Sequence, residues 1–212
     1  DALLKLNDIN LNLRALIYQK ISMFFFALER PEDAIMFLNK SLDITPKNLE
    51  AWLNKGYILE KIDEIEESNK CYDEILIIDR KNKFALNNKA SNLRRIGQFD
   101  EALTYIDKAL EVDSNFIVAI NNKTNILKSL KKSKEALTFL EEKKDLLHKS
   151  INLQAAKVDL CIDLLDLKQA YETNEEILEK DPNYVDAINN KGVIFEKNSK
   201  FQKRDKYLPL AL

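Results

Sequence analysis

Polar and apolar residues follow the period of an α-helix along residues 84–96. Residues three and four apart lie on the same face of a helix. One face would carry Phe84, Asn87, Asn88, Ser91, Arg94 and Arg95, and the opposite face Leu86, Lys89, Ala90, Leu93 and Ile96. We therefore predict an amphipathic helix whose apolar face packs and whose asparagines point away from the packed helices.

The same pattern returns at a fixed distance along the chain. The stretch "ALNNKA" begins at residue 85, "AINNKT" at 119 and "AINNKG" at 187, so the offsets are 34 and 68 residues. A regular period of this size is typical of stacked helical repeats. Five whole repeats fit without insertion, at residues 15–48, 49–82, 83–116, 117–150 and 151–184. A partial repeat or cap follows over 185–212. We expect residues 1–14 to be part of a helix of a preceding repeat, and 1–212 to form a single solenoid domain.

Small residues recur at two positions of the repeat, where two helices would approach closely. The third position holds Ala51, Ala85, Ala119 and Ala187, and the twentieth holds Ala34, Ser68, Ala102, Ala136 and Ala170. The eighth position holds Gly56 and Gly192, which we expect at helix crossings. Gly97 falls in the predicted turn between two helices, where a glycine commonly ends the first one.

The amino-acid composition limits the fold class and the kinds of partner that the chain can have. With only 3 Gly and 4 Pro the chain is predicted to be almost entirely helical. The net charge of -2 provides no overall attraction to nucleic acid or to an anionic membrane. The most apolar run, "ISMFFFAL", is too short to span a bilayer, so we predict no membrane segment and a cytoplasmic location. Because the chain begins with Asp1 rather than Met, we expect it to be a fragment of a longer protein.

The repeats resemble a known family. The small and aromatic positions of "AWLNKGYIL" and "GQFDEALTYIDKALEVD", with the junction "DPNYVDAINNKG", are similar to tetratricopeptide repeats of an archaeal or bacterial type, over nearly the whole chain. The resemblance implies an all-α fold of antiparallel helix pairs, about 50–62 with 65–78 and 84–95 with 99–112, stacked into a right-handed α-solenoid. It also implies that the first helix of each pair lines a concave groove.

Two segments depart from the repeat pattern. The stretch "KKDLLHKSIN" replaces the usual acidic and proline junction of the fourth repeat, so we expect the second helix to run on there. The stretch "FQKRDKYLPLAL" is expected to be a last, truncated helix that meets Pro209.

On this resemblance the asparagines face the groove. Asparagine has both a hydrogen-bond donor and an acceptor, so a row of them can hold an extended peptide by its backbone. We predict such a row from Asn54, Asn87, Asn88, Asn121, Asn122, Asn189 and Asn190. The alternative is an ordinary solvated face in a chain rich in lysine and asparagine.

Two further features of the groove could select a ligand. An apolar patch of Met23, Phe26, Leu53 and Tyr57 is predicted to seat an apolar side chain, since contiguous apolar surface usually marks an interface. A basic stretch of Arg94, Arg95 and Lys128 is predicted to meet an acidic residue. The alternative for the patch is that it lies under repeats outside this chain.

A lysine recurs on the packing face of each repeat from the second onward, as Lys55, Lys89, Lys123, Lys157 and Lys191. An unpaired buried ammonium is very costly. We therefore expect the stems to pack and the amines to emerge near acidic residues such as Asp79 or Asp113.

No constellation of catalytic residues is apparent. The single histidine, His148, has no nucleophile at a recognisable spacing, there is no glycine-rich phosphate loop, and Cys71 and Cys161 occupy packing positions. We therefore predict no enzyme activity, no cofactor and no metal site. The predicted partner is a protein or peptide ligand rather than nucleic acid or a membrane. Self-association, or a regulatory role within a larger enzyme, remain open alternatives.

Overall fold

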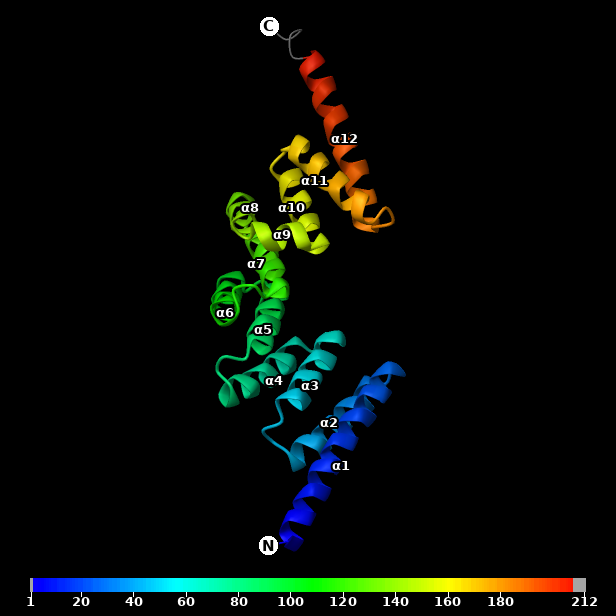
Figure 1. Cartoon of the computed structure of the whole chain (residues 1–212), viewed down its shortest axis with the longest axis vertical. Coiled ribbons are helices and arrows are strands. Elements are labelled where there is room, and N and C mark those ends of the chain that lie inside the picture. The colour runs from blue at the N-terminus through cyan, green and yellow to red at the C-terminus, as the bar shows by residue number, and fades with distance from the viewer. Residues whose placement is uncertain (1, 208–212) are drawn as a thin grey trace. The chain divides into compact units, whose positions relative to one another are not determined.

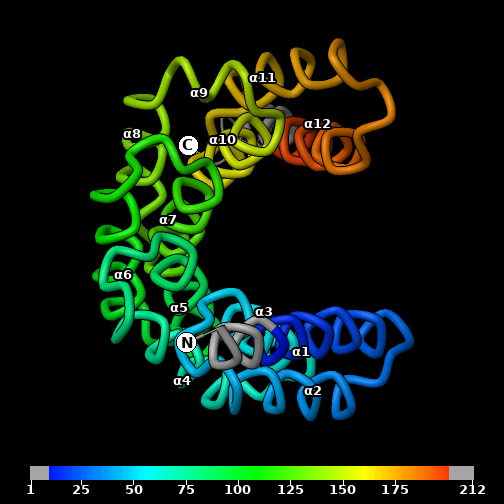
Figure 2. The backbone as a smooth tube through the Cα atoms, turned by 60° about the horizontal axis from the view of Figure 1, so that its bottom comes forward, coloured from blue at the N-terminus to red at the C-terminus, as the bar shows by residue number. Residues whose placement is uncertain are grey.

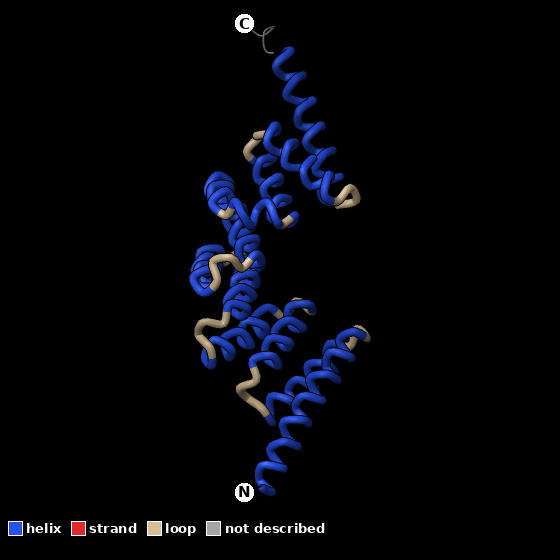
Figure 3. The backbone as a smooth tube through the Cα atoms, in the orientation of Figure 1, coloured by secondary structure: helices blue, strands red, loops and turns tan. Residues whose placement is uncertain are grey.

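Helices joined by short turns make up the described chain (Figure 3). The computed structural model describes residues 2–207, with side chains over 10–200, and holds no strand in that range. Its helices are α1 (Ala2–Ala27), α2 (Pro31–Ile44), α3 (Leu49–Lys61), α4 (Ile65–Ile78), α5 (Lys83–Arg95), α6 (Phe99–Val112), α7 (Ile117–Ser129), α8 (Ser133–Glu142), α9 (Lys144–Lys149), α10 (Ile151–Asp163), α11 (Leu167–Lys180) and α12 (Val185–Tyr207). The all-α prediction is confirmed.

The chain divides into two units, one ending at Ser114 and one beginning at Asn115. In the first, which we call unit 1, each helix from α1 to α6 packs against the next. In the second, unit 2, α10 packs against α7 and α8, and α12 packs against α10 and α11. Figures 1 and 2 show the successive helix hairpins of each unit, which is the arrangement expected of stacked helical repeats.

The turn inside each hairpin is built in the same way at intervals of 34 residues. Its left-handed residues are Glu29 (φ 58°), Asp63 (67°), Gly97 (78°), Lys131 (60°) and Leu165 (63°). At Gly97 the backbone N–H donates to Arg94 O at 3.1 Å, and the next N–H, of Gln98, donates to Leu93 O at 2.9 Å. This is the Schellman pattern, which satisfies the last carbonyls of a helix. Glycine is expected at such a position, yet four of the five residues carry a side chain.

The small residues lie where the repeat pattern places them. Every alanine of the two small positions, and Ser68, is 0 % exposed. At Gly56 an added Cβ would lie 2.7 Å from Cε1 of Tyr72, and the Ser68 hydroxyl donates to Gly56 O at 2.8 Å. The crossing expected at Gly192 is not found, since a Cβ there would meet nothing within 4 Å. The reason is that no described helix follows α12 to cross it.

Three of the five recurring lysines pair with a carboxylate 16 residues earlier, on the second helix of the preceding repeat. Lys89 pairs with Asp73, Lys157 Nζ lies 3.6 Å from Glu141 Oε1, and Lys191 Nζ lies 2.8 Å from Glu175 Oε1. Each of these pairs lies within one unit. The ladder is therefore a contact between neighbouring repeats, in agreement with its structural interpretation.

The expected partners of these lysines were wrong. Asp113 instead accepts from Lys83 at 2.6 Å. Lys89 reaches the Asp73 carboxylate in the middle of α4, and its Nζ lies 4.6 Å from the centre of the Tyr105 ring. Burial lowers the pKa of Lys89, but hydrogen bonds to Asp73 and Tyr105 and their charges outweigh it, so the pKa is raised.

Three helix boundaries differ from those expected. Residues 2–14 are helical, but α1 runs from Ala2 to Ala27 without a linker, because no proline or glycine interrupts it. In the fourth repeat the second helix does not run on: it ends at Glu142, and the six-residue α9 then buries Leu147. Up to Tyr207, the last residue described, no separate helix forms, since α12 continues without a left-handed turn residue. Pro209 lies outside the described residues.

Candidate functional site

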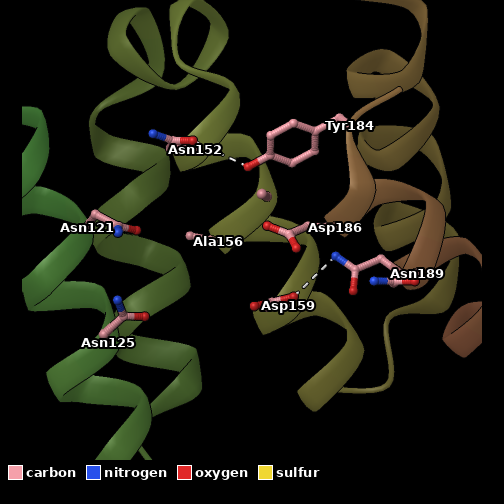
Figure 4. Close-up of a pocket in the computed structure, with 10 residues that line it drawn as sticks. Asn121, Asn125, Asn152, Ala156, Asp159, Tyr184, Asp186 and Asn189 are labelled. Atoms are coloured by element: carbon pink, nitrogen blue, oxygen red, sulfur yellow. Dashed lines mark hydrogen bonds between the residues drawn. The ribbon is translucent and has the colours of Figure 1, made fainter. Parts of the chain in front are cut away.

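A polar cavity of about 460 Å³ lies within unit 2 (Figure 4). Residues of α7, α10 and α12, and the turn before α12, line it: Asn121, Asn125, Asn152, Ala155, Ala156, Asp159, Tyr184, Asp186, Asn189 and Asn190. Its size is within the roughly 300–1,000 Å³ typical of ligand pockets, although its lining is far more polar than most. We call this the amide cavity.

A departure from the repeat pattern opens the amide cavity. Ala155 and Ala156 stand at the two positions that carry asparagine pairs in the repeats before and after, Asn121 with Asn122 and Asn189 with Asn190. A methyl group in place of a carboxamide leaves space over α10. In Figure 4, Ala156 and Asp159 lie between Asn121 and Asn125 on one side and Tyr184, Asp186 and Asn189 on the other.

Two side-chain hydrogen bonds join α10 to the end of the unit. Asn190 Nδ2 donates to Asp159 Oδ1 and the Tyr184 hydroxyl donates to Asn152 Oδ1, each at 3.3 Å. These bonds hold one wall of the cavity. Within the described residues no side-chain hydrogen bond or ion pair is formed by Asn121, Asn125, Asp186 or Asn189, so their polar groups remain available to a ligand.

The environment of Asp159 shifts the pKa of its carboxyl upward. Its half-burial is the largest effect and raises the pKa of the carboxyl. The charge of Lys128 and the hydrogen bond from Asn190 lower that pKa, and the charges of Asp163 and Asp186 raise it again. Lys128 Nζ is 3.8 Å from Asp159 Oδ2 and 3.4 Å from Asp163 Oδ2, so its charge is shared between the two.

Of the residues predicted in unit 2, the cavity brings together Asn121, Asn189 and Asn190. Asn122 is half-buried and does not line it. The prediction missed Asn125, Asn152, Asp159, Tyr184 and Asp186 as members of one site. A signal was present, since Asn125 and Asp159 share the ninth position of the repeat, and Asn152 and Asp186 share the second.

In unit 1 the predicted asparagines differ from one another. Asn54 and Asn88 are half-buried, as expected for the side of a groove. Asn87 is only 3 % exposed and donates to Asn88 Oδ1 at 3.0 Å. The side chain is therefore buried, which differs from its predicted open orientation, and its Nδ2 is directed along the helix toward Asn88.

The predicted apolar patch is partly assembled in unit 1. The rings of Phe26 and Tyr57 meet edge to face with centroids 5.8 Å apart, and Met23 and Tyr57 are exposed. Leu53 is turned toward a different neighbour, the core around Tyr72. Met23 and Tyr57 thus form the exposed part of the patch, with the half-buried Phe26 beside them.

The basic stretch stays a prediction, and two of its three cations already lie next to carboxylates of the chain itself. Arg95 is bound to the preceding turn, since its NH2 lies 2.7 Å from Asp63 Oδ1 and its NH1 donates to Glu60 O at 3.2 Å. Lys128 is bound to Asp163, and Arg94 is half-buried. Arg95 and Lys128 thus lie next to carboxylates of neighbouring repeats.

The described residues contain neither a candidate membrane-spanning helix nor a candidate metal site. None of the described helices combines the length and the apolar character that a membrane crossing needs. Over the same residues, no three histidine, cysteine or acidic side chains gather as metal ligands would. The absence of metal, cofactor and catalytic chemistry stays a prediction from the sequence.

Comparison with known proteins identifies the repeats. A family model described as "Tetratricopeptide repeat" matches residues 15–48, 49–82 and 85–116. No curated protein sequence matches the chain.

Solved structures resemble the chain in fold. PilF of Pseudomonas aeruginosa has a TM-score of 0.71 and 16% identity, over 95% of this chain and 93% of that one. MamA of Desulfovibrio magneticus RS-1 has a TM-score of 0.68 and 17% identity, over 81% and 97%. YrrB, described as a repeat protein of the same type with an unusual peptide-binding site, has a TM-score of 0.63 and 17% identity, over 91% and 98%. Identities this low establish a shared fold alone.

Proposed function

Because the chain belongs to the tetratricopeptide repeat family, whose members serve as protein-interaction scaffolds, we propose that it holds an extended peptide segment in the amide cavity of unit 2. The observation that carries the proposal is the convergence of unpaired amides from separate helices on one cavity. Asn121 and Asn125 come from α7 and Asn189 comes from α12.

The chemistry of these amides suits a peptide backbone. Each carboxamide donates and accepts, so it can bond to a peptide N–H and a peptide C=O in the same way that another strand would. Since α7, α10 and α12 are held by packing, the ordering cost of binding falls on the ligand. Affinity would then come from several small contacts, with little dependence on the side chains of the ligand at these positions.

Unit 1 offers a second surface for a ligand of the same kind. We assign the role of binding an apolar side chain to the exposed Met23 and Tyr57, with the half-buried Phe26 ring beside them. Asn54 and Asn88 would bond to the adjoining backbone. Phe26→Ala with Tyr57→Ala should weaken such binding, and unchanged affinity would remove the patch from the proposal.

The function can be tested with a display library of random nine-residue peptides selected on the wild-type chain. Selected peptides are then measured by fluorescence anisotropy against Asn121→Ala with Asn189→Ala. We expect at least a tenfold loss of affinity, with an unchanged helical circular dichroism spectrum. The matched control is Asn39→Ala with Asn198→Ala, which removes two exposed amides elsewhere. Equal binding by both double variants would refute the proposal.

Self-association is a second candidate function, favoured by exposed apolar side chains on α12. Val185, Ile188 and Phe195 are 66%, 51% and 53% exposed. Light scattering over a hundredfold range of protein concentration distinguishes the two functions. A constant monomer mass would remove self-association, and a mass that rises with concentration and falls in Ile188→Ser with Phe195→Ser would support it.

A further inference from the structure

The amide cavity has an acidic character that its amides do not explain. Asp159 and Asp186 both line it, and none of its ten lining residues is a lysine or an arginine. The nearby cation, Lys128, does not line the cavity and is closer to Asp163 than to Asp159, at 3.4 Å against 3.8 Å. The cavity surface therefore carries a net negative charge.

Asp186 is the less neutralised of the two carboxylates. It is exposed, at the start of α12, and forms no ion pair or side-chain hydrogen bond within the described residues. In Figure 4 its carboxylate faces the space over Ala156, between Tyr184 and Asp159. A cation in that space would lie between two carboxylates, which is a favourable position for a positive charge.

Asp159 would gain most from a cation. Its carboxylate is half-buried and already accepts from Asn190, and burial raises its pKa despite Lys128. A positively charged group in the cavity would stabilise the Asp159 carboxylate and so offset the hydration that the carboxylate loses by burial. The other titratable groups that act on Asp159 are Asp163 and Asp186, which are also acidic.

The space suits a long basic side chain. Ala155 and Ala156 present methyl groups against which an aliphatic stem can pack. The Tyr184 ring lies at the edge, where it can stack on a guanidinium or an ammonium group. The amides Asn121 and Asn125 stand opposite, where they can hold the backbone on either side of that residue.

We propose that the amide cavity selects a positively charged side chain, arginine or lysine, of the segment that it binds. Asp159 and Asp186 are the residues that determine this preference. The proposal rests on the peptide-scaffold function above. It reverses the charge that the sequence predicted for the ligand.

The test uses four nine-residue peptides built from alanine, glycine and serine, acetylated and amidated, whose central residue is arginine, lysine, citrulline or glutamate. Citrulline keeps the shape of arginine and removes the charge. Binding to the wild-type chain is followed by chemical-shift changes of the asparagine side-chain amides. We expect the arginine and lysine peptides to bind at least tenfold more tightly than the other two, and raised salt to weaken them selectively.

The preference for the arginine and lysine peptides over the citrulline and glutamate peptides should fall below about threefold in Asp159→Asn with Asp186→Asn. This double substitution keeps the shape of both side chains and removes their charge. The matched control is Asp43→Asn with Asp100→Asn, which removes two charges from exposed positions in unit 1. Two results would overturn the inference: equal binding of the arginine and citrulline peptides, or a preference that survives in the cavity variant. If the peptides bind equally and Asn121→Ala with Asn189→Ala abolishes all binding, the scaffold function stands alone. If no peptide binds, both proposals fail.

Discussion

The two helical glycines at the eighth position of the repeat should respond oppositely to the same substitution. In Gly56→Ala the new Cβ would lie 2.7 and 2.9 Å from two atoms of the Tyr72 ring. That ring is 0 % exposed and cannot swing into solvent. In Gly192→Ala the Cβ would meet nothing within 4 Å.

The magnitudes follow from two opposing effects. Replacing glycine by alanine inside a helix stabilises it by about 0.5–1 kcal/mol. Overpacking a well-packed core costs about 1–3 kcal/mol. We expect Gly56→Ala to destabilise unit 1 by about 0.5–2 kcal/mol, because the ring must shift, and Gly192→Ala to stabilise unit 2 by somewhat less than 1 kcal/mol.

Urea unfolding separates the two units in this test. The single tryptophan, Trp52, lies in unit 1 next to Gly56, so its fluorescence reports that unit, while circular dichroism at 222 nm follows both. A double-mutant cycle with Tyr72→Leu isolates the contact, since Gly56→Ala should become neutral or stabilising once the ring is absent. A stabilising Gly56→Ala in the wild-type background would refute the packing argument.

Three other predictions follow from local features. Leu165 and Gly97 both have a left-handed backbone, a conformation that only glycine adopts freely. In urea titrations, Leu165→Gly should therefore stabilise unit 2 by about 0.5–1 kcal/mol, and Gly97→Ala should destabilise unit 1 by about 1 kcal/mol. Changes of the opposite sign would contradict the turn geometry. Burial raises the pKa of Cys71 and of Cys161 to about 11, so iodoacetamide at pH 8 should label neither thiol until the chain unfolds. The free energy of unfolding should fall as pH rises from 9 to 11, because the thiols of the unfolded chain ionise first. Labelling of the native chain would show that the thiols are accessible. The raised pKa of Asp159 means that its ionised form is disfavoured in the folded state, so stability is lost as pH rises through that pKa. Asp159→Asn should therefore leave unit 2 at least as stable as the wild type in urea unfolding at pH 7. A clear loss of stability would show that the charge of Asp159 is structural.

Most of the fold could be predicted from the period. Small residues every 34 positions mark helix contacts because only they permit close approach, and Ala51, Ala85 and Ala119 are indeed fully buried. Helix ends were predictable only where the repeat pattern persisted. Lys143 interrupts the fourth repeat in a stretch without glycine or proline, where local sequence carries no signal for a break.

The partners of charged residues could not be predicted from one helix alone. A helical wheel places Lys128 on a polar face of its helix. Whether its amine is unpaired depends on which side chains the next repeat places beside it. Here that repeat presents Asp159 and Asp163, which neutralise it. The burial of Asn87 likewise depends on its surroundings in the fold, where its Nδ2 donates to the neighbouring Asn88.

The amide cavity illustrates where a repeat protein can acquire a specific site. A regular ladder presents the same group at each step, so it can hold a backbone but cannot distinguish one ligand from another. Ala155 and Ala156 interrupt that ladder and create space, and Asp159 and Asp186 give the space a charge. The positions that fit the period explain why the chain stacks, and the positions that depart from it are the ones on which selectivity can depend. A search for function in such a chain should therefore begin at the repeat whose residues match the others least.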